Sequence, residues 1–199
     1  MSAQVLAAMF VDSDAFDRLG LVLRQLVVGL VDQAVNLRLV GPEPRLNSIA
    51  LGPIQTVIHQ NISWPVIKRR TQQLIDVLSH RPPNVVHAMS VGTYPAAIAI
   101  ANAFDADLLL HVTSKADLDA ISPTVQQCAR RIIASSQPLV DQLLGRPDVR
   151  PSQVELIRPG LLAGSRMTTF VHEGKFTTLV CTSNLQKAKR VDVLIRAVS

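Results

Sequence analysis

Short aliphatic runs alternate along this chain with segments of helical periodicity, and that alternation restricts the fold more than any other feature. Runs such as Val5–Val11, Asn84–Ala88 and Asp107–Val112 are almost continuously apolar, as expected for strands that are buried on both faces. Helical patterns lie between them, for example at Phe16–Ala34 and Tyr94–Phe104. Strands separated by helices at this spacing form a parallel sheet. We therefore predict an α/β fold with a Rossmann-like, doubly wound, mainly parallel sheet and helices on both faces.

The remaining elements continue this alternation through a first domain at residues 1–160. Further strands are predicted at Asn36–Val40, within 47–60, at Arg131–Ala134 and at Val154–Arg158, and further helices at 63–79, Asp117–Gln127 and Pro138–Leu144. The stretch 161–176 contains Gly, Ser and Thr without periodicity, which predicts a linker.

Residues 177–199 have the pattern of a new α/β unit. Thr177–Cys181 is predicted to be a buried strand, and after a polar turn the apolar residues Val191, Leu194, Ile195 and Val198 recur at helical spacing. One strand with one helix cannot bury its own faces. We therefore expect 177–199 to be the first strand and helix of a truncated second domain, so that half of any interdomain site is missing.

The composition disfavours nucleic acid as a partner. Aromatic residues make up only 4% of the chain, which leaves little to stack on bases despite the net charge of +5. The scattered basic residues fit a solvated surface, with an anionic ligand or an anionic membrane as alternatives. A basic helix at Trp64–Ser79 offers a possible peripheral membrane contact. Two cysteines without a CxxC pattern favour reduced thiols. The predicted location is the cytoplasm, with the inner membrane face as the alternative.

Polar side chains lie where the predicted strands end, and parallel sheets bind ligands outside the carboxyl ends of their strands. His87 and His111 come near the ends of two successive strands. Each alone is equally well explained as a hydrogen-bonded core residue, but together they could orient or deprotonate a hydroxyl group. The other candidates at this edge are Asp12, Ser13, Ser90, Ser114 and Ser135.

The sequence contains no motif for a resident metal or cofactor. It has no HExxH, no cluster of His and Cys, no GxGxxG after the first strand and no GxxxxGK[ST]. Asp12 to Asp14 spell D-x-D, but their place between a strand and a helix favours capping. We therefore predict no metal and no cofactor.

Four segments, in this order, carry a resemblance to a known family: NVVHAMSVGTYPAAIAIANAFDADLLLHVTS, RRIIASSQPLVDQLL, VELIRPGL and LVCTSNLQKAKRVDVLIRAV. Together they resemble the retaining glycosyltransferases of the GT-B fold, in particular the family 4 type. The resemblance implies an N-terminal domain that binds an acceptor glycan or lipid, and a C-terminal domain that binds a nucleotide sugar as donor substrate. The oligomeric state stays open.

The same resemblance implies roles for individual residues. His111 would be the catalytic histidine facing the transferred sugar, with His87 and the other polar candidates on the acceptor side or cleft wall. Lys189 would contact the donor diphosphate, with Arg190 and Asn184 beside it. Asn184 stands where the family has arginine, and the donor carboxylate motif would lie beyond Ser199. The sequence thus predicts the N-terminal portion of a glycosyltransferase, inactive alone; the alternative is a degenerate, non-catalytic protein of this fold that binds a glycan or a partner.

Overall fold

The computed structural model describes residues 4–43, 46–47, 54–59, 67–160, 193 and 195–196. Contacts divide the chain into two units, Met1–Leu162 and Ala163–Ser199, and the fold given below is that of the first. The predicted linker at 161–176 and the predicted strand at 177–181 lie outside the described residues. Of the predicted last helix, only Val193, Ile195 and Arg196 are described, and they are helical.

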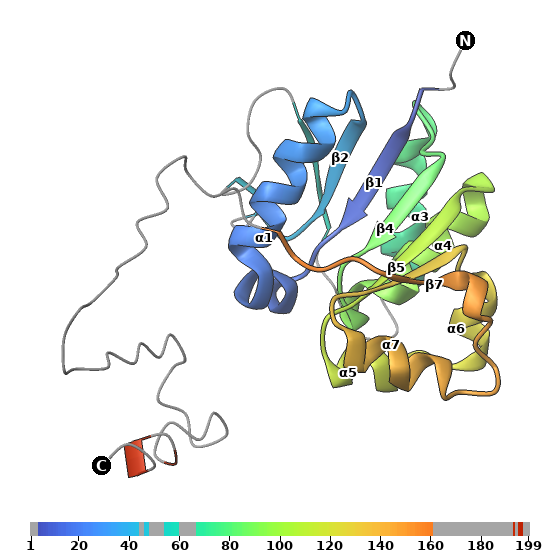
Figure 1. Ribbon diagram of the computed structural model, residues 1–199. Coiled ribbons are helices and arrows are strands. Elements are labelled where there is room, and N and C mark those ends of the chain that lie inside the picture. The colour runs from blue at the N-terminus through green and yellow to red at the C-terminus, as the bar shows by residue number, and fades with distance from the viewer. Residues whose placement is uncertain are drawn as a thin grey trace, which may run out of the picture. The chain divides into compact units, whose positions relative to one another are not determined.

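Seven parallel strands form one sheet in the order β3-β2-β1-β4-β5-β6-β7 (Figure 1). The strands are β1 (Leu6–Phe10), β2 (Asn36–Gly41), β3 (Gln55–Ile58), β4 (Val85–Ala88), β5 (Asp107–Val112), β6 (Arg131–Ala134) and β7 (Val154–Leu156). All six pairings are parallel. The order reverses at β1 and β4, where a doubly wound sheet places its ligand crevice. The predicted fold class is confirmed.

Helices cover both faces of this sheet. They are α1 (Ser13–Asp32), α3 (Ile67–Ser79), α4 (Tyr94–Phe104), α5 (Lys115–Asp119), α6 (Pro123–Cys128) and α7 (Gln137–Leu144), with short 3-10 turns at Val91–Thr93 and Pro151–Gln153. The single helix predicted at Asp117–Gln127 is wrong. A break separates α5 from α6 because Ser122 caps a new helix that has Pro123 in its first turn. The last strand is also shorter than predicted, ending at Leu156.

Two apolar clusters pack on opposite faces of the sheet. One joins Phe16, Leu23 and Val27 of α1 to Met9 and its neighbours in the sheet. The larger cluster places α3, α4, α5 and α7 against the alternate residues of the strands (Figure 1). Side chains alternate between the two faces along a strand. The strand residues that alternate with those of the larger cluster therefore point toward the face covered by α1.

Gly41 at the end of β2 permits a close backbone approach. A Cβ at this position would lie 2.4 Å from the backbone oxygen of Val11, well inside van der Waals contact. The end of β2 therefore needs a residue without a side chain. The ends of β1 and β2 are joined at the sheet's carboxyl edge by a 2.9 Å hydrogen bond from the Val11 N–H to the Val40 oxygen. No helix among the described residues is long and apolar enough to cross a membrane.

Candidate functional site

Two histidines lie stacked on the α1 face, near the carboxyl ends of β4 and β5. The strand register places His87 beside Met9 of β1 and Leu109 of β5. His111 is two residues after Leu109 in β5, so its side chain points to the same face of the sheet as that of His87. Their rings are 5.4 Å apart between centroids and inclined by only 5°. Both side chains are buried, at 8% and 9% exposure. The two histidines that the sequence places near the ends of successive strands therefore lie side by side in the structure.

Burial makes both imidazoles neutral near pH 7. Loss of solvation, with a smaller effect of the neighbouring His111, lowers the pKa of His87 to about 3. Loss of solvation also lowers the pKa of His111 to about 4. A neutral imidazole has one nitrogen that donates and one that accepts a hydrogen bond. Nε2 of His87 and Nδ1 of His111 have no hydrogen-bond partner among the described residues, so they retain capacity to bind a ligand or water.

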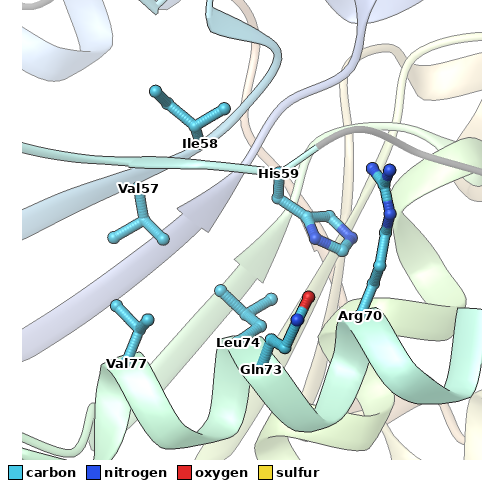
Figure 2. Close-up of a pocket in the computed structure, with 7 residues that line it drawn as sticks. All are labelled: Val57, Ile58, His59, Arg70, Gln73, Leu74 and Val77. Atoms are coloured by element: carbon cyan, nitrogen blue, oxygen red, sulfur yellow. The ribbon is translucent and has the colours of Figure 1, made fainter.

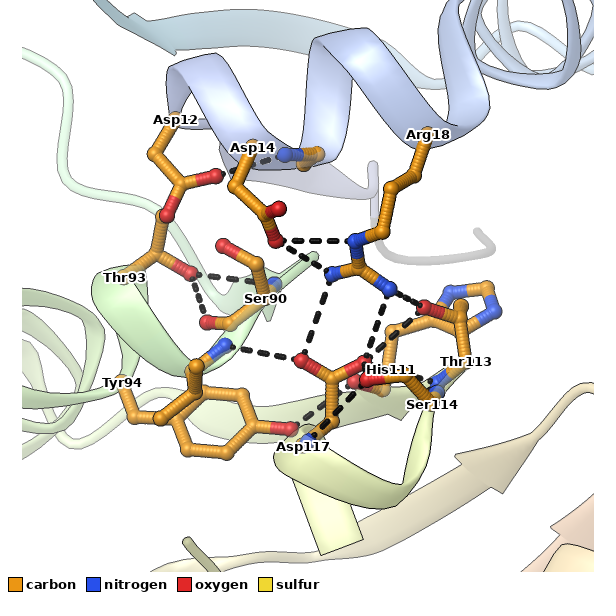
Figure 3. A network of polar contacts seen from close by, with 12 residues as sticks. Asp12, Asp14, Arg18, Ser90, Thr93, Tyr94, His111, Thr113, Ser114 and Asp117 are labelled. Atoms are coloured by element: carbon orange, nitrogen blue, oxygen red, sulfur yellow. Dashed lines mark hydrogen bonds and ion pairs between the residues drawn. The ribbon is translucent and has the colours of Figure 1, made fainter. Parts of the chain in front are cut away.

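Asp117, in α5, organises the loops next to His111 (Figure 3). Its fully buried carboxylate accepts hydrogen bonds from the backbone N–H groups of Thr113 and Ser114, each at 3.0 Å, and from both hydroxyls at 2.9 Å. Its second oxygen accepts from the Val91 N–H at 3.2 Å. Burial alone would raise the pKa of Asp117, but these hydrogen bonds and the Arg18 charge lower it. The carboxylate therefore stays ionised and joins the loops that follow β4 and β5.

Arg18 extends this network from α1. Its guanidinium donates to Asp117 at 3.2 and 3.3 Å, to the Thr113 hydroxyl, and to Asp14 at 2.8 Å. The arginine side chain is 28% exposed and that of Asp14 is 61% exposed. Arg18 thus forms a bridge from the first helix to the loop after β5, and one side of it faces solvent.

Tyr94 holds the end of β5 from the opposite face. Its hydroxyl donates a 2.8 Å hydrogen bond to the backbone oxygen of His111. Burial, followed by the nearby Asp117 charge, raises the pKa of Tyr94, which keeps the phenol protonated as a donor. The backbone that carries His111 is consequently held at the strand end by Tyr94, and the loop that follows it by Asp117 and Arg18.

The other predicted residues have separate positions along the same edge. Asp12 caps α1, accepting from the Ala15 N–H at 2.8 Å, and Ser13 is exposed in the first turn of that helix. Ser90 is fully buried after β4, and its hydroxyl has no partner among the described residues. Ser114 caps α5, and Ser135 is half-buried after β6. The donor-side residues Lys189, Asn184 and Arg190 lie outside the described residues.

Sequence analysis missed the contribution of Arg18, Asp117 and Tyr94. Ser114 and Asp117 have the spacing of a capping box, a pattern that could have identified the helix start and the buried carboxylate. No local pattern links Arg18 to Asp117, because they are 99 residues apart in the sequence. No group of three His, Cys, Asp or Glu residues suited to a metal ion occurs within the described part of the chain.

A separate pocket of about 340 Å³ lies at the far edge of the sheet, between β3 and α3 (Figure 2). His59 and Arg70 line it with Gln73 and the apolar side chains of Val57, Ile58, Leu74 and Val77. Burial and the Arg70 charge lower the pKa of His59. Since β1 and β2 separate β3 from β4, this pocket does not belong to the histidine site.

Comparisons with known proteins show the fold. No protein-family model matches the chain, and no curated protein matches it significantly. Among solved structures, Anabaena HepE in complex with UDP and glucose is 11% identical, with a TM-score of 0.59 over 79% of this chain and 45% of HepE. The lipopolysaccharide outer core galactosyltransferase WaaB is 13% identical, with a TM-score of 0.57 over 78% of this chain and 45% of WaaB.

A glycosyltransferase from Rickettsia africae gives a similar match, at 11% identity and a TM-score of 0.59 over 78% of this chain and 43% of that protein. The chain therefore spans less than half the length of each of these three proteins. These likenesses show that the chain has the Rossmann-like α/β fold of the GT-B glycosyltransferases.

Proposed function

We propose that this chain is the N-terminal, acceptor-side portion of a retaining glycosyltransferase of the family 4 type, inactive alone. The observation that carries the proposal is the pair of neutral, buried histidines at the carboxyl edge of a sheet with this fold. The solved structure of HepE, which shares the fold, contains UDP and glucose. The proposed donor is a nucleotide sugar, and the proposed acceptor is a glycan or a lipid-linked alcohol.

In the proposed reaction, the bond between the anomeric carbon of the sugar and the diphosphate oxygen breaks. A new bond forms between that carbon and the acceptor oxygen, and the acceptor proton leaves with the diphosphate. His111 contributes a neutral ring that hydrogen-bonds a hydroxyl of the transferred sugar, with His87 stacked against it. Ser90, with its unpartnered hydroxyl, is a further group at the same edge. Lys189 and Arg190 stabilise the departing diphosphate by their charge.

The histidine and serine side chains need a fixed backbone to act in this way. Apart from its bonds with Arg18, Asp117 accepts five hydrogen bonds, from the Val91 N–H and from the N–H and hydroxyl groups of Thr113 and Ser114. These bonds hold the loops after β4 and β5. Preorganised groups lower a barrier more than mobile ones because no reorganisation is required during the reaction. Asp117 and Arg18 are thus proposed as positioning residues. The protein acts in the cytoplasm, with peripheral contact at the inner membrane face where the acceptor is a lipid.

The test uses the protein encoded by the complete reading frame. Release of UDP from UDP-glucose is measured for the wild type, for His111→Ala and for His80→Ala, an exposed histidine that serves as control. We expect His111→Ala to lower kcat by roughly a hundredfold or more, and His80→Ala to leave it unchanged. Failure of the folded wild-type protein to bind UDP-glucose at millimolar concentration would overturn the proposal.

A second candidate function is non-catalytic binding of a glycan or a partner by a degenerate protein of this fold. One sequence observation favours it: Asn184 occupies the position where the family has a diphosphate-binding arginine. The variant Asn184→Arg separates the two candidates in the same protein. An enzyme that has kept its donor site should bind UDP-glucose more tightly with the added cation. A protein that has lost the site should bind no donor in either form.

A further inference from the structure

An apolar pocket of about 370 Å³ lies beside His111, on the α1 face of the sheet. Its walls are α1 and the segment Ile157–Gly160, which leaves β7 and runs toward α1 (orange in Figure 1). All of its lining residues belong to the unit Met1–Leu162. A pocket of this size accommodates a small ligand.

The α1 wall of this pocket is a stripe of residues spaced three or four apart. Leu19, Val22, Leu26 and Gly29 lie along it, and this spacing places them on one side of the helix. A different stripe, which includes Leu23 and Val27, packs into the sheet core. The helix thus buries Leu23 and Val27 in the core. Leu19 and Leu26 are only partly buried against that core and also line the pocket. The missing side chain of Gly29 leaves space, since a Cβ there would have no atom within 4 Å.

Three polar side chains interrupt the apolar lining: His111, Gln25 and the exposed Arg158. His111 contributes its imidazole, whose Nδ1 has no partner among the described residues, and Gln25 contributes an amide whose Oε1 is buried and likewise unpartnered. Unsatisfied polar atoms in an apolar site are costly unless a ligand or water pairs with them. The combination favours a molecule that has an apolar body and at least one hydroxyl group.

We propose that this pocket binds the apolar part of an amphiphilic alcohol, with a hydroxyl of that molecule at the His111 end. Placed beside the histidine pair, such a molecule is the sugar acceptor; that identification rests on the glycosyltransferase function proposed above. The acceptor class is thereby narrowed from glycans in general to alcohols that carry an alkyl, isoprenoid or comparable apolar group.

The test measures binding of alkyl β-D-glucopyranosides to the 199-residue chain by calorimetry, below their micellar concentrations. The series runs from methyl through hexyl and heptyl to octyl glucoside. A chain that enters the pocket should tighten binding by roughly fourfold for each added methylene. Binding that does not depend on chain length would overturn the proposal.

Two matched variants locate the binding. Gly29→Leu places a side chain into the open space of the pocket wall. The control Gly20→Leu makes the same change in the same helix but outside the pocket lining. At both positions a Cβ would have no atom within 4 Å. Both replace a helical glycine by a strong helix former, so both should fold and melt at a higher temperature. We expect octyl glucoside to bind about tenfold more weakly to Gly29→Leu and unchanged to Gly20→Leu. Equal affinity for the two variants would contradict the assignment.

The variant His111→Phe tests the polar end. It keeps a flat ring but removes the hydrogen-bonding nitrogens, and octyl glucoside should bind roughly fivefold more weakly; unchanged affinity would overturn the placement of the hydroxyl. None of these measurements requires a nucleotide sugar. Chain-dependent binding without UDP release would leave the pocket assignment standing and overturn the proposed function. UDP release without chain-dependent binding would leave the proposed function standing and overturn the pocket assignment.

Discussion

Lowering the pH from 8 to 5 should destabilise the fold through the buried histidine pair. Folding lowers the pKa of His87 from 6.5 to about 3 and that of His111 from 6.5 to about 4. For a group whose pKa is lower in the folded state, the stabilising contribution is complete above the unfolded pKa. It is lost as the pH falls toward the folded pKa, because the unfolded chain then binds more protons.

The magnitude follows from these values. At pH 5 the unfolded chain has protonated nearly all of both histidines, whereas the folded chain has protonated few. Each site then shifts the equilibrium toward unfolding by about 2 kcal/mol, which makes about 4 kcal/mol for the pair. Since a domain of this size has a total stability on the order of 10 kcal/mol, the loss should be conspicuous.

The assay is urea unfolding, followed by circular dichroism, at several pH values between 8 and 5. His87→Phe keeps an aromatic ring against His111 but cannot take up a proton. Between pH 8 and pH 5 its free energy of unfolding should therefore fall by about 2 kcal/mol less than that of the wild type. His80→Gln removes an exposed histidine and should show the full wild-type loss. Comparing losses rather than absolute stabilities cancels any packing change at pH 8. A loss in His87→Phe as large as in the wild type would refute the reasoning that His87 is buried in its neutral form.

Three further substitutions test the network and the backbone around the site. Asp117→Asn replaces a carboxylate oxygen that accepts hydrogen bonds by an amide that donates, and urea unfolding should show a free energy of unfolding lower by about 3 kcal/mol. The control Asp119→Asn changes an exposed carboxylate and should lower it by less than about 0.5 kcal/mol. Equal effects of the two substitutions would contradict the account of Asp117 as a buried anchor. Gly41→Ala forces a Cβ against the Val11 oxygen and should cost about 1 to 3 kcal/mol by thermal unfolding, so an unchanged melting temperature would count against that close approach. Asp12→Ala removes the helix cap and should cost about 1 kcal/mol, whereas Asp12→Ser should recover most of that loss in the same measurement.

The fold was largely accessible from the sequence because the inner strands of its sheet, β1, β2, β4, β5 and β6, are mostly buried. A strand in that environment is apolar along most of its length, so β5 and β6 were predicted with their observed bounds, as was the small-residue helix α4. The error at 117–127 has a local cause. Leu118, Ile121 and Val125 keep helical spacing across Pro123, although Ser122 caps a new helix at that point.

The candidate site was only partly accessible. The rule that ligands bind at the carboxyl ends of parallel strands identified His87 and His111 together, since both lie near those ends. Their stacking and their neutrality depend on burial in the folded protein, which no local pattern reports. The bridge from Arg18 to Asp117 and the pocket between α1 and Ile157–Gly160 depend on tertiary packing between distant segments in the same way.

The central claim is that His111 contacts the sugar of a bound nucleotide sugar. The most direct measurement is an NMR titration of the imidazole signals in the protein from the complete reading frame, with UDP-glucose and separately with UDP. The account predicts that UDP-glucose moves the His111 signals much more than UDP does, while those of exposed His80 stay in place. Equal shifts of the His111 signals with the two ligands, or none with UDP-glucose at saturation, would contradict it.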